Sequence, residues 1–148
     1  MNQRYIVDTT TIISYFAKIF DVKCVISKQG IDIIEKAFEN NSTILLIPSI
    51  VFIEIFSKKF ISPEIAAKIR YNVYEKVKAC ENISIEPIDQ EVMEHFIRIV
   101  DIEKDYNFDN HDKIIFATAM KYQVPLITSD LRLIRYNNKK KLIPQIIS

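Results

Sequence analysis

The chain is poor in glycine and cysteine, and each shortage excludes a class of site. Gly30 is the only glycine among 148 residues, whereas a phosphate-binding loop of the P-loop or dinucleotide type needs several glycines close together. Cys24 and Cys80 lie far apart in the sequence and form no C-x-x-C pair. They therefore give no zinc framework, and such spacing is typical of reduced thiols in the cytosol.

The chain also lacks a strong net charge and a long apolar run. The formal net charge of +1 gives no overall basic field that would by itself indicate nucleic-acid binding. However, a cation held in an acidic site would make the local potential more positive than this count. No apolar stretch approaches the ~18 residues of a membrane helix, and Asp8 comes too early for a signal peptide. We therefore expect a cytoplasmic protein with no membrane association.

Against this background, four acidic residues lie within or directly beside strongly apolar segments. Burying a carboxylate that has no partner costs several kcal/mol, so buried acids are normally paired or bound to a metal ion. Mg²⁺ prefers oxygen ligands and keeps several waters, so a few carboxylates suffice to hold it. We predict one acidic pocket for Mg²⁺ or Mn²⁺, formed by Asp8 after residues 5–7, Glu54 within 50–56, Asp112 before 114–117 and Asp130 after 125–128.

The order of the expected elements predicts an α/β fold. The length suits a single domain, residues 1–148, with one core. Because strands alternate with helices, we expect right-handed βαβ units and a mostly parallel sheet. The expected strands are 4–8, 43–47, 83–88 and 125–128, with a fifth near 141–143; the expected helices are 10–20, 31–40, one after Ser49 that carries Glu54, 62–80, 90–102 and 109–122, with a loop at 21–30.

This topology predicts that the four acids meet. In open parallel sheets the ligand site lies beyond the carboxyl ends of the strands. Asp8 ends the first expected strand, and Asp130 comes just past the fourth. Glu54 is on the helix that leaves the second strand, and Asp112 is in the first turn of the helix that leads into the fourth. Residues far apart in sequence are therefore expected at one edge of one sheet.

Each acid also has a purely structural interpretation. Asp8 is a plausible N-cap for the helix that follows it, and Asp130 is a plausible turn residue. Asp112 stands at a helix start, although Asp109 is the better cap there. Glu54 can reach solvent only from an otherwise apolar face, which argues against a surface role. The joint occurrence of the four favours a common site.

The segments 6–10, 47–54, 112–119 and 126–130 occur in an order and spacing that resemble the PIN-domain ribonucleases, especially the VapC-type toxins. The resemblance covers nearly the whole chain. It implies a three-layer α/β/α sandwich around a mostly parallel sheet of four to five strands, and a Mg²⁺- or Mn²⁺-dependent endoribonuclease. It also implies that Asp8, Glu54, Asp112 and Asp130 form the catalytic and metal-binding quartet, supported by Thr10 and Thr128.

The same resemblance implies partners. An RNA substrate, a cognate antitoxin and a homodimer are expected. Apolar residues between 62 and 80 spread around the expected helix instead of forming one narrow stripe. Because apolar surface left over from the core usually marks an interface, we expect the helices 31–40 and 62–80 at or beside protein interfaces.

Several basic residues are candidates for RNA contacts. His111 adjoins Asp112, and the remaining candidates occur in two basic clusters. Side chains of this kind are more often simply solvated, so both interpretations stay open. The candidates are His111, Lys58, Lys59, Arg132 and Arg135.

Two other functions remain possible on sequence grounds. One is a catalytically silent PIN-like module that binds RNA or protein, against which the intact quartet argues. The other is a metal-dependent phosphatase or phosphoryl-transfer enzyme on a similar sheet. A phosphatase of the haloacid-dehalogenase type needs a second aspartate two residues after Asp8, where this chain has Thr10.

Overall fold

The computed structural model describes residues 3–39, 42–58, 62–102 and 108–148. They form a five-stranded sheet in the order β3-β2-β1-β4-β5, and every pairing is parallel. This confirms the expected α/β/α architecture around a parallel sheet. The strands are β1 Gln3–Val7, β2 Thr43–Pro48, β3 Ile83–Glu86, β4 Leu126–Ile127 and β5 Ile146–Ile147.

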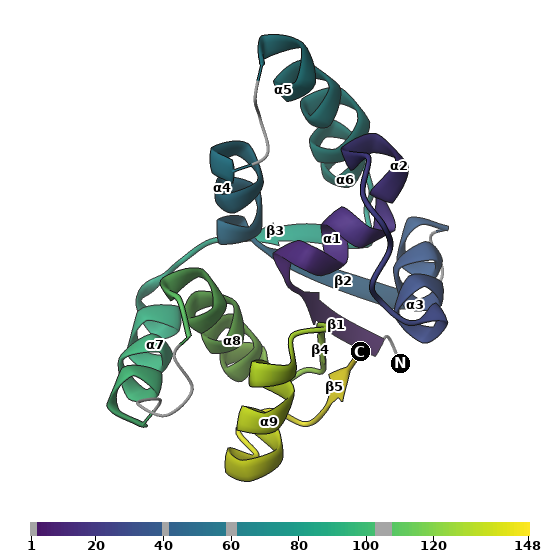
Figure 1. The fold of residues 1–148 in the computed structure, drawn as a ribbon. Coiled ribbons are helices and arrows are strands. Elements are labelled where there is room, and N and C mark those ends of the chain that lie inside the picture. Colours follow the sequence, from purple (N-terminus) through teal and green to yellow (C-terminus); the bar gives the residue numbers. More distant parts are fainter. Residues whose placement is uncertain (1–2, 40–41, 59–61, 103–107) are drawn as a thin grey trace.

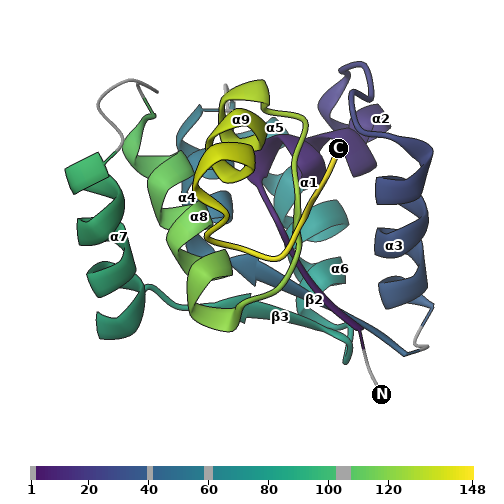
Figure 2. The same cartoon turned by 90° about the horizontal axis from the view of Figure 1, so that it is seen from below.

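Helices cover both faces of this sheet. Both views place α7 and α8 on one side of β1, and α1 and α3 on the other (Figures 1 and 2). The helix α4 packs against both α1 and α8. The bounds are α1 Thr9–Tyr15, α2 Ala17–Phe20, α3 Lys28–Phe38, α4 Ser49–Lys58, α5 Pro63–Ile69, the π-helical turn η1 Arg70–Tyr74, α6 Glu75–Lys78, α7 Gln90–Ile102, α8 Asn110–Tyr122 and α9 Leu131–Lys140.

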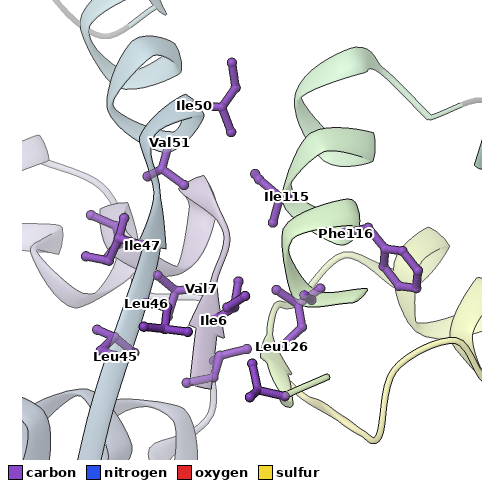
Figure 3. Packing of buried hydrophobic residues seen from close by; sticks show 14 of the residues in the cluster. Ile6, Val7, Leu45, Leu46, Ile47, Ile50, Val51, Ile115, Phe116 and Leu126 are labelled. Carbon is purple, nitrogen blue, oxygen red and sulfur yellow. The ribbon is translucent and has the colours of Figure 1, made fainter. Parts of the chain in front are cut away.

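The central strands are buried on both faces, which explains their continuous apolar sequences. Ile6 and Val7 of β1 are fully buried, and so are Leu45 and Ile47 of β2. Parallel strands covered by helices on both sides have this pattern, in place of alternating apolar and polar residues. Their side chains gather with those of α4 and α8 in one cluster (Figure 3). None of the described helices is long and apolar enough to cross a membrane.

The helix α9 was not predicted. The side chain of Asp130 accepts a hydrogen bond from the backbone N–H of Arg132, so the residue expected in a turn caps a helix. That helix ends at Lys141, which adopts the left-handed conformation with φ of 53°. Glycine usually occupies such a position. With no glycine there, the sequence lacks the commonest signal for the end of this helix.

The expected fifth strand near 141–143 is wrong, because β5 lies at Ile146–Ile147. The side chain of Asn137 accounts for the difference. Its Oδ1 accepts hydrogen bonds from the backbone N–H groups of Leu142 and Ile143, both at 3.1 Å, and its Nδ2 donates to the carbonyl of Ile143. These bonds occupy backbone groups that a strand would use in the ladder.

Two helix boundaries also differ from the prediction. The helix expected at 10–20 breaks at Phe16 into α1 and α2, and α3 begins at Lys28 inside the expected loop. Ser27 explains the second difference, because its hydroxyl caps α3 by accepting from the backbone N–H of Gly30.

The strand order locates the crevice of the sheet. From β1, the chain adds β2 and β3 on one side and β4 and β5 on the other. Loops leaving β1 and β4 therefore diverge at their carboxyl ends, and ligands of open α/β sheets bind at such a point. Asp8 directly follows β1, and Asp130 closely follows β4.

Candidate functional site

Asp8 is the most deeply buried of the four predicted acids. Its side chain is buried, with 4% of the residue exposed. Its Oδ1 accepts from the backbone N–H of Thr11 at 2.8 Å and lies 2.6 Å from the Thr11 hydroxyl. The hydroxyl of Thr128 donates to its Oδ2. Asp8 is thus both the N-cap of α1 and a carboxylate fixed by the segment after β4.

The Thr11 hydroxyl connects the two central strand ends. It lies 2.8 Å from the carbonyl oxygen of Ile127 as well as close to Asp8. A hydroxyl has one hydrogen, so it can donate to only one of these two acceptors at a time. Burial raises the pKa of Asp8, and the hydrogen bonds from Thr11 and Thr128 offset only part of that rise.

Asp112 lies in the first turn of α8, and burial together with neighbouring charges shifts its pKa. Asp109 caps this helix, as expected, by accepting from the backbone N–H of Asp112 at 2.9 Å. Burial raises the pKa of Asp112 to about 7, with further contributions from the charges of Asp109, Asp130 and Asp8. The charge of Arg132 partly opposes the rise. The acids from three separate segments therefore share one electrostatic environment.

Arg132 lies between two of these acids. Its Nη2 is 2.9 Å from Oδ2 of Asp130 and 3.3 Å from Oδ2 of Asp112. Its Nε also donates to Oδ1 of Asp130 at 3.2 Å. Burial alone would raise the pKa of Asp130, but the hydrogen bonds from the side chain and backbone of Arg132 outweigh it, so the pKa is lowered.

Glu54, on α4, lies beside the first turn of α8. It is half-buried, and its Oε2 lies 3.4 Å from Nδ1 of His111. Ligand atoms of Glu54, Asp109 and His111 all lie within 4.8 Å of one another. His111, one of the candidate RNA contacts, therefore faces an acid of the predicted quartet.

These residues fit a divalent cation. Burial is the largest cause of the raised pKa of Asp112, and the negative charges of Asp109, Asp130 and Asp8 add to it, so a cation would relieve repulsion here. The guanidinium of Arg132 between Asp112 and Asp130 demonstrates that a positive charge can lie among them. Carboxylate oxygens suit Mg²⁺ and Mn²⁺, and an imidazole nitrogen such as that of His111 suits Mn²⁺ better than Mg²⁺.

The supporting residues are placed differently from the expectation in one respect. Thr128 is buried and donates to Asp8, whereas Thr10 is exposed. The role of Thr10 stays a prediction. Thr11, which makes the hydrogen bonds to Asp8, was missed. The signal was present, because an N-cap carboxylate commonly accepts from the third helical residue, and Thr11 is that residue of α1.

Of the remaining candidate RNA contacts, the structure describes the side chains of Arg132 and Arg135. Arg132 contacts the acids directly, and Arg135 is exposed one turn later on α9. Lys59 and the side chain of Lys58 lie outside the described residues. Their roles stay predictions.

The raised pKa of Asp112 predicts how the metal-free protein responds to pH. Between about pH 4 and 7 the folded protein retains a proton that the unfolded chain has released, so stability falls as pH rises through this window. Asp112→Asn removes this titration. We expect the variant and wild type to melt alike near pH 4, and the variant to melt several degrees higher at pH 7 and above. Thermal melts in chelator measure this.

Asp32→Asn, at an exposed acid on α3, is the control for loss of one charge. If the difference in melting temperature between Asp112→Asn and wild type does not change with pH, the titration does not belong to Asp112.

Comparison with solved structures shows a common fold at low sequence identity. A chain in the crystal structure of VapBC2 from Rickettsia felis bound to a DNA fragment from the promoter is 16% identical, with a TM-score of 0.62 over 99% of this chain and 98% of that chain. A chain of FitAcB from Neisseria gonorrhoeae is 12% identical, with a TM-score of 0.66 and coverages of 97% and 96%. A chain of VapBC-5 from Mycobacterium tuberculosis, a member of the VapBC family of toxin–antitoxin systems, is 15% identical, with a TM-score of 0.61 and coverages of 98% and 98%.

The search of curated proteins gives no match. The family model of the PIN domain matches residues 5–139. This range contains Asp8, Glu54, Asp112 and Asp130, and it extends from within β1 almost to the end of α9. The chain therefore belongs to the PIN-domain family.

Proposed function

We propose that this protein is a metal-dependent endoribonuclease and the toxin of a type II toxin–antitoxin pair. One observation carries the proposal: the charges of Asp8, Asp112 and Asp130, from three segments of the chain, act on one another at the carboxyl ends of β1 and β4. The family membership and the solved toxin–antitoxin structures of the same fold support it.

Asp8, Glu54, Asp112 and Asp130 would hold the cation, either Mg²⁺ or Mn²⁺. When bound, such a cation supplies a water of lowered pKa and stabilises charge on phosphate oxygens. The hydrogen bonds from Thr11 and Thr128 fix Asp8 before any substrate arrives, so little reorganisation is needed.

The protein also offers a group that suits an RNA phosphate. Arg135 is exposed on α9 near the same edge of the sheet. Its charge provides binding that does not depend on base identity. The N-terminus of α8 is capped by Asp109 and carries Asp112 in its first turn, so a bound divalent cation would have to offset these acids before a phosphate approaches.

An antitoxin segment is the partner we propose for a pocket on the neighbouring surface. The pocket lies between α4 and η1 and is largely apolar, with one basic residue. Ile53 at this pocket is 51% exposed. It directly precedes Glu54 on α4. A partner that covers it would therefore lie close to the metal site. The pocket is lined by Phe52, Ile53, Phe56, Arg70 and Tyr74.

The nuclease proposal predicts the effect of removing each acid. Asp8→Asn, Glu54→Gln, Asp112→Asn and Asp130→Asn should each reduce cleavage of a mixed RNA pool, by at least about a hundredfold for Asp8 and Asp112, because each removes charge from one cation site. The effect of Asp130→Asn should be the smallest. Cleavage is measured with Mg²⁺ and with Mn²⁺, and circular dichroism checks the fold.

Asp32→Asn on α3 is the matched control and should cleave like wild type. Full activity of Asp8→Asn in the presence of metal would refute the catalytic assignment. RNA binding without cleavage by wild type would favour the silent module, and hydrolysis of p-nitrophenyl phosphate in place of RNA would favour a phosphatase.

We also propose a homodimer. Fewer apolar residues are exposed for such an interface than the sequence led us to expect. Within the helical segment 63–78, Ile69, Val73 and Val77 are buried in the core. Tyr71 is 68% exposed and remains available for a partner. An exposed aromatic side chain is a frequent anchor of an interface.

Light scattering of the isolated protein should therefore give the mass of a dimer at high micromolar concentration. Tyr71→Glu should shift this equilibrium toward monomer, because a charge in an apolar contact is costly to bury. A monomeric wild type under these conditions would rule out the homodimer and leave the nuclease proposal standing.

A further inference from the structure

We propose that Arg132 is a built-in counterion of the metal site, which bridges Asp112 and Asp130 in the metal-free protein and leaves them when the divalent cation binds. This inference rests on the proposed metal site and goes beyond it, because it assigns a role to a residue that is not itself a metal ligand.

The first support is geometric. Nη2 of Arg132 lies within ion-pair distance of Oδ2 of both Asp112 and Asp130, at 3.3 Å and 2.9 Å. Nε of the same guanidinium donates to Oδ1 of Asp130 at 3.2 Å. The guanidinium therefore engages both oxygens of one acid and an oxygen of another. Those are the atoms that a cation would use.

The second support is chemical. A guanidinium has donors but no acceptor and stays protonated, so it cannot itself bind a metal ion. Two positive charges that compete for the same carboxylate oxygens repel each other strongly at such short distances. Cation binding at Asp112 and Asp130 therefore requires the guanidinium to move away.

The third support is that Arg132 can move without disturbing the acids. Its side chain is 47% exposed, so it can extend into solvent from the first turn of α9. Asp130 keeps two other hydrogen bonds. Its Oδ1 accepts from the backbone N–H of Arg132 at 2.8 Å, and its own N–H donates to Thr128 Oγ1 at 3.0 Å. The position of Asp130 thus does not depend on the arginine side chain.

The role has two consequences, and the second separates it from a role in which Arg132 only orients Asp130. In the metal-free protein, Arg132 relieves the repulsion among the acids and so stabilises the fold. In the presence of metal, it competes and so weakens cation binding. If Arg132 instead served only to orient Asp130 for the metal, its removal would weaken cation binding. The two roles therefore predict metal affinities that change in opposite directions.

The test compares Arg132→Ala with Arg135→Ala, which removes the same charge one turn later on the same helix. Among the described residues, Arg135 makes no ion pair with an acid of the site. Calorimetric titration with Mn²⁺ and with Mg²⁺ gives the dissociation constants. We expect Arg132→Ala to bind either ion about three- to tenfold more tightly than wild type, the range set by loss of partly exposed ion pairs, and Arg135→Ala to differ from wild type by less than twofold.

Thermal melts supply a second measurement that needs no catalysis. Metal-free Arg132→Ala should melt below metal-free Arg135→Ala, and saturating Mn²⁺ should raise its melting temperature by more. Arg132→Lys keeps the charge without the fork of donors, so its metal affinity should lie between those of wild type and Arg132→Ala. This variant keeps the test decisive if Arg132→Ala fails to fold.

The outcomes separate this inference from the proposed function. The counterion role is overturned if both Arg132 variants bind metal as wild type does, or more weakly than Arg135→Ala does. The metal site would then remain in place. Failure of wild type and of all three variants to bind either ion overturns the metal site together with the counterion role.

Discussion

The hydrogen bonds of Thr11 and Thr128 to Asp8 are the link on which the site depends. Thr11 reaches from α1 to both Asp8 and the last residue of β4, and Thr128, directly after β4, donates to the other oxygen of Asp8. They join the ends of two neighbouring parallel strands at the point where the chain connections diverge. Without them, a buried carboxylate beside the fully buried Ile6 and Val7 would be strongly unfavourable.

The carboxylates near these hydrogen bonds repel one another. The raised pKa of Asp112 and the lowered pKa of Asp130 arise in the same small region, and Arg132 lies between the two. Such crowding costs stability, and natural proteins retain such costs mainly where a function needs them. The surrounding core, from β1 and β2 to α8, is apolar and tightly buried, so it can hold the acids in place.

The sequence predicted the parallel sheet and the proximity of Asp8, Asp112 and Asp130, because buried parallel strands and their carboxyl-end loops leave clear patterns. That Glu54 shares a cation site with them stays a prediction. The patterns did not predict α9, whose end lacks a glycine, and they misplaced β5, because the side chain of Asn137 binds backbone groups of Leu142 and Ile143. The contacts of Thr11 with Asp8 and the ion pairs of Arg132 were not predicted, and the role of Thr10 stays a prediction. Side-chain rotamers and long-range pairs of this kind depend on tertiary packing, which sequence patterns alone do not reveal.

We infer that carboxylates from these separate segments form one cation site. Diffraction recorded near the manganese absorption edge, from a crystal of the protein grown with Mn²⁺, tests this inference. An anomalous peak should lie within coordination distance of carboxylate oxygens of Asp8 and Asp112, with Glu54 and Asp130 around it. An absent peak, or a peak bound only by residues away from the ends of β1 and β4, would contradict it.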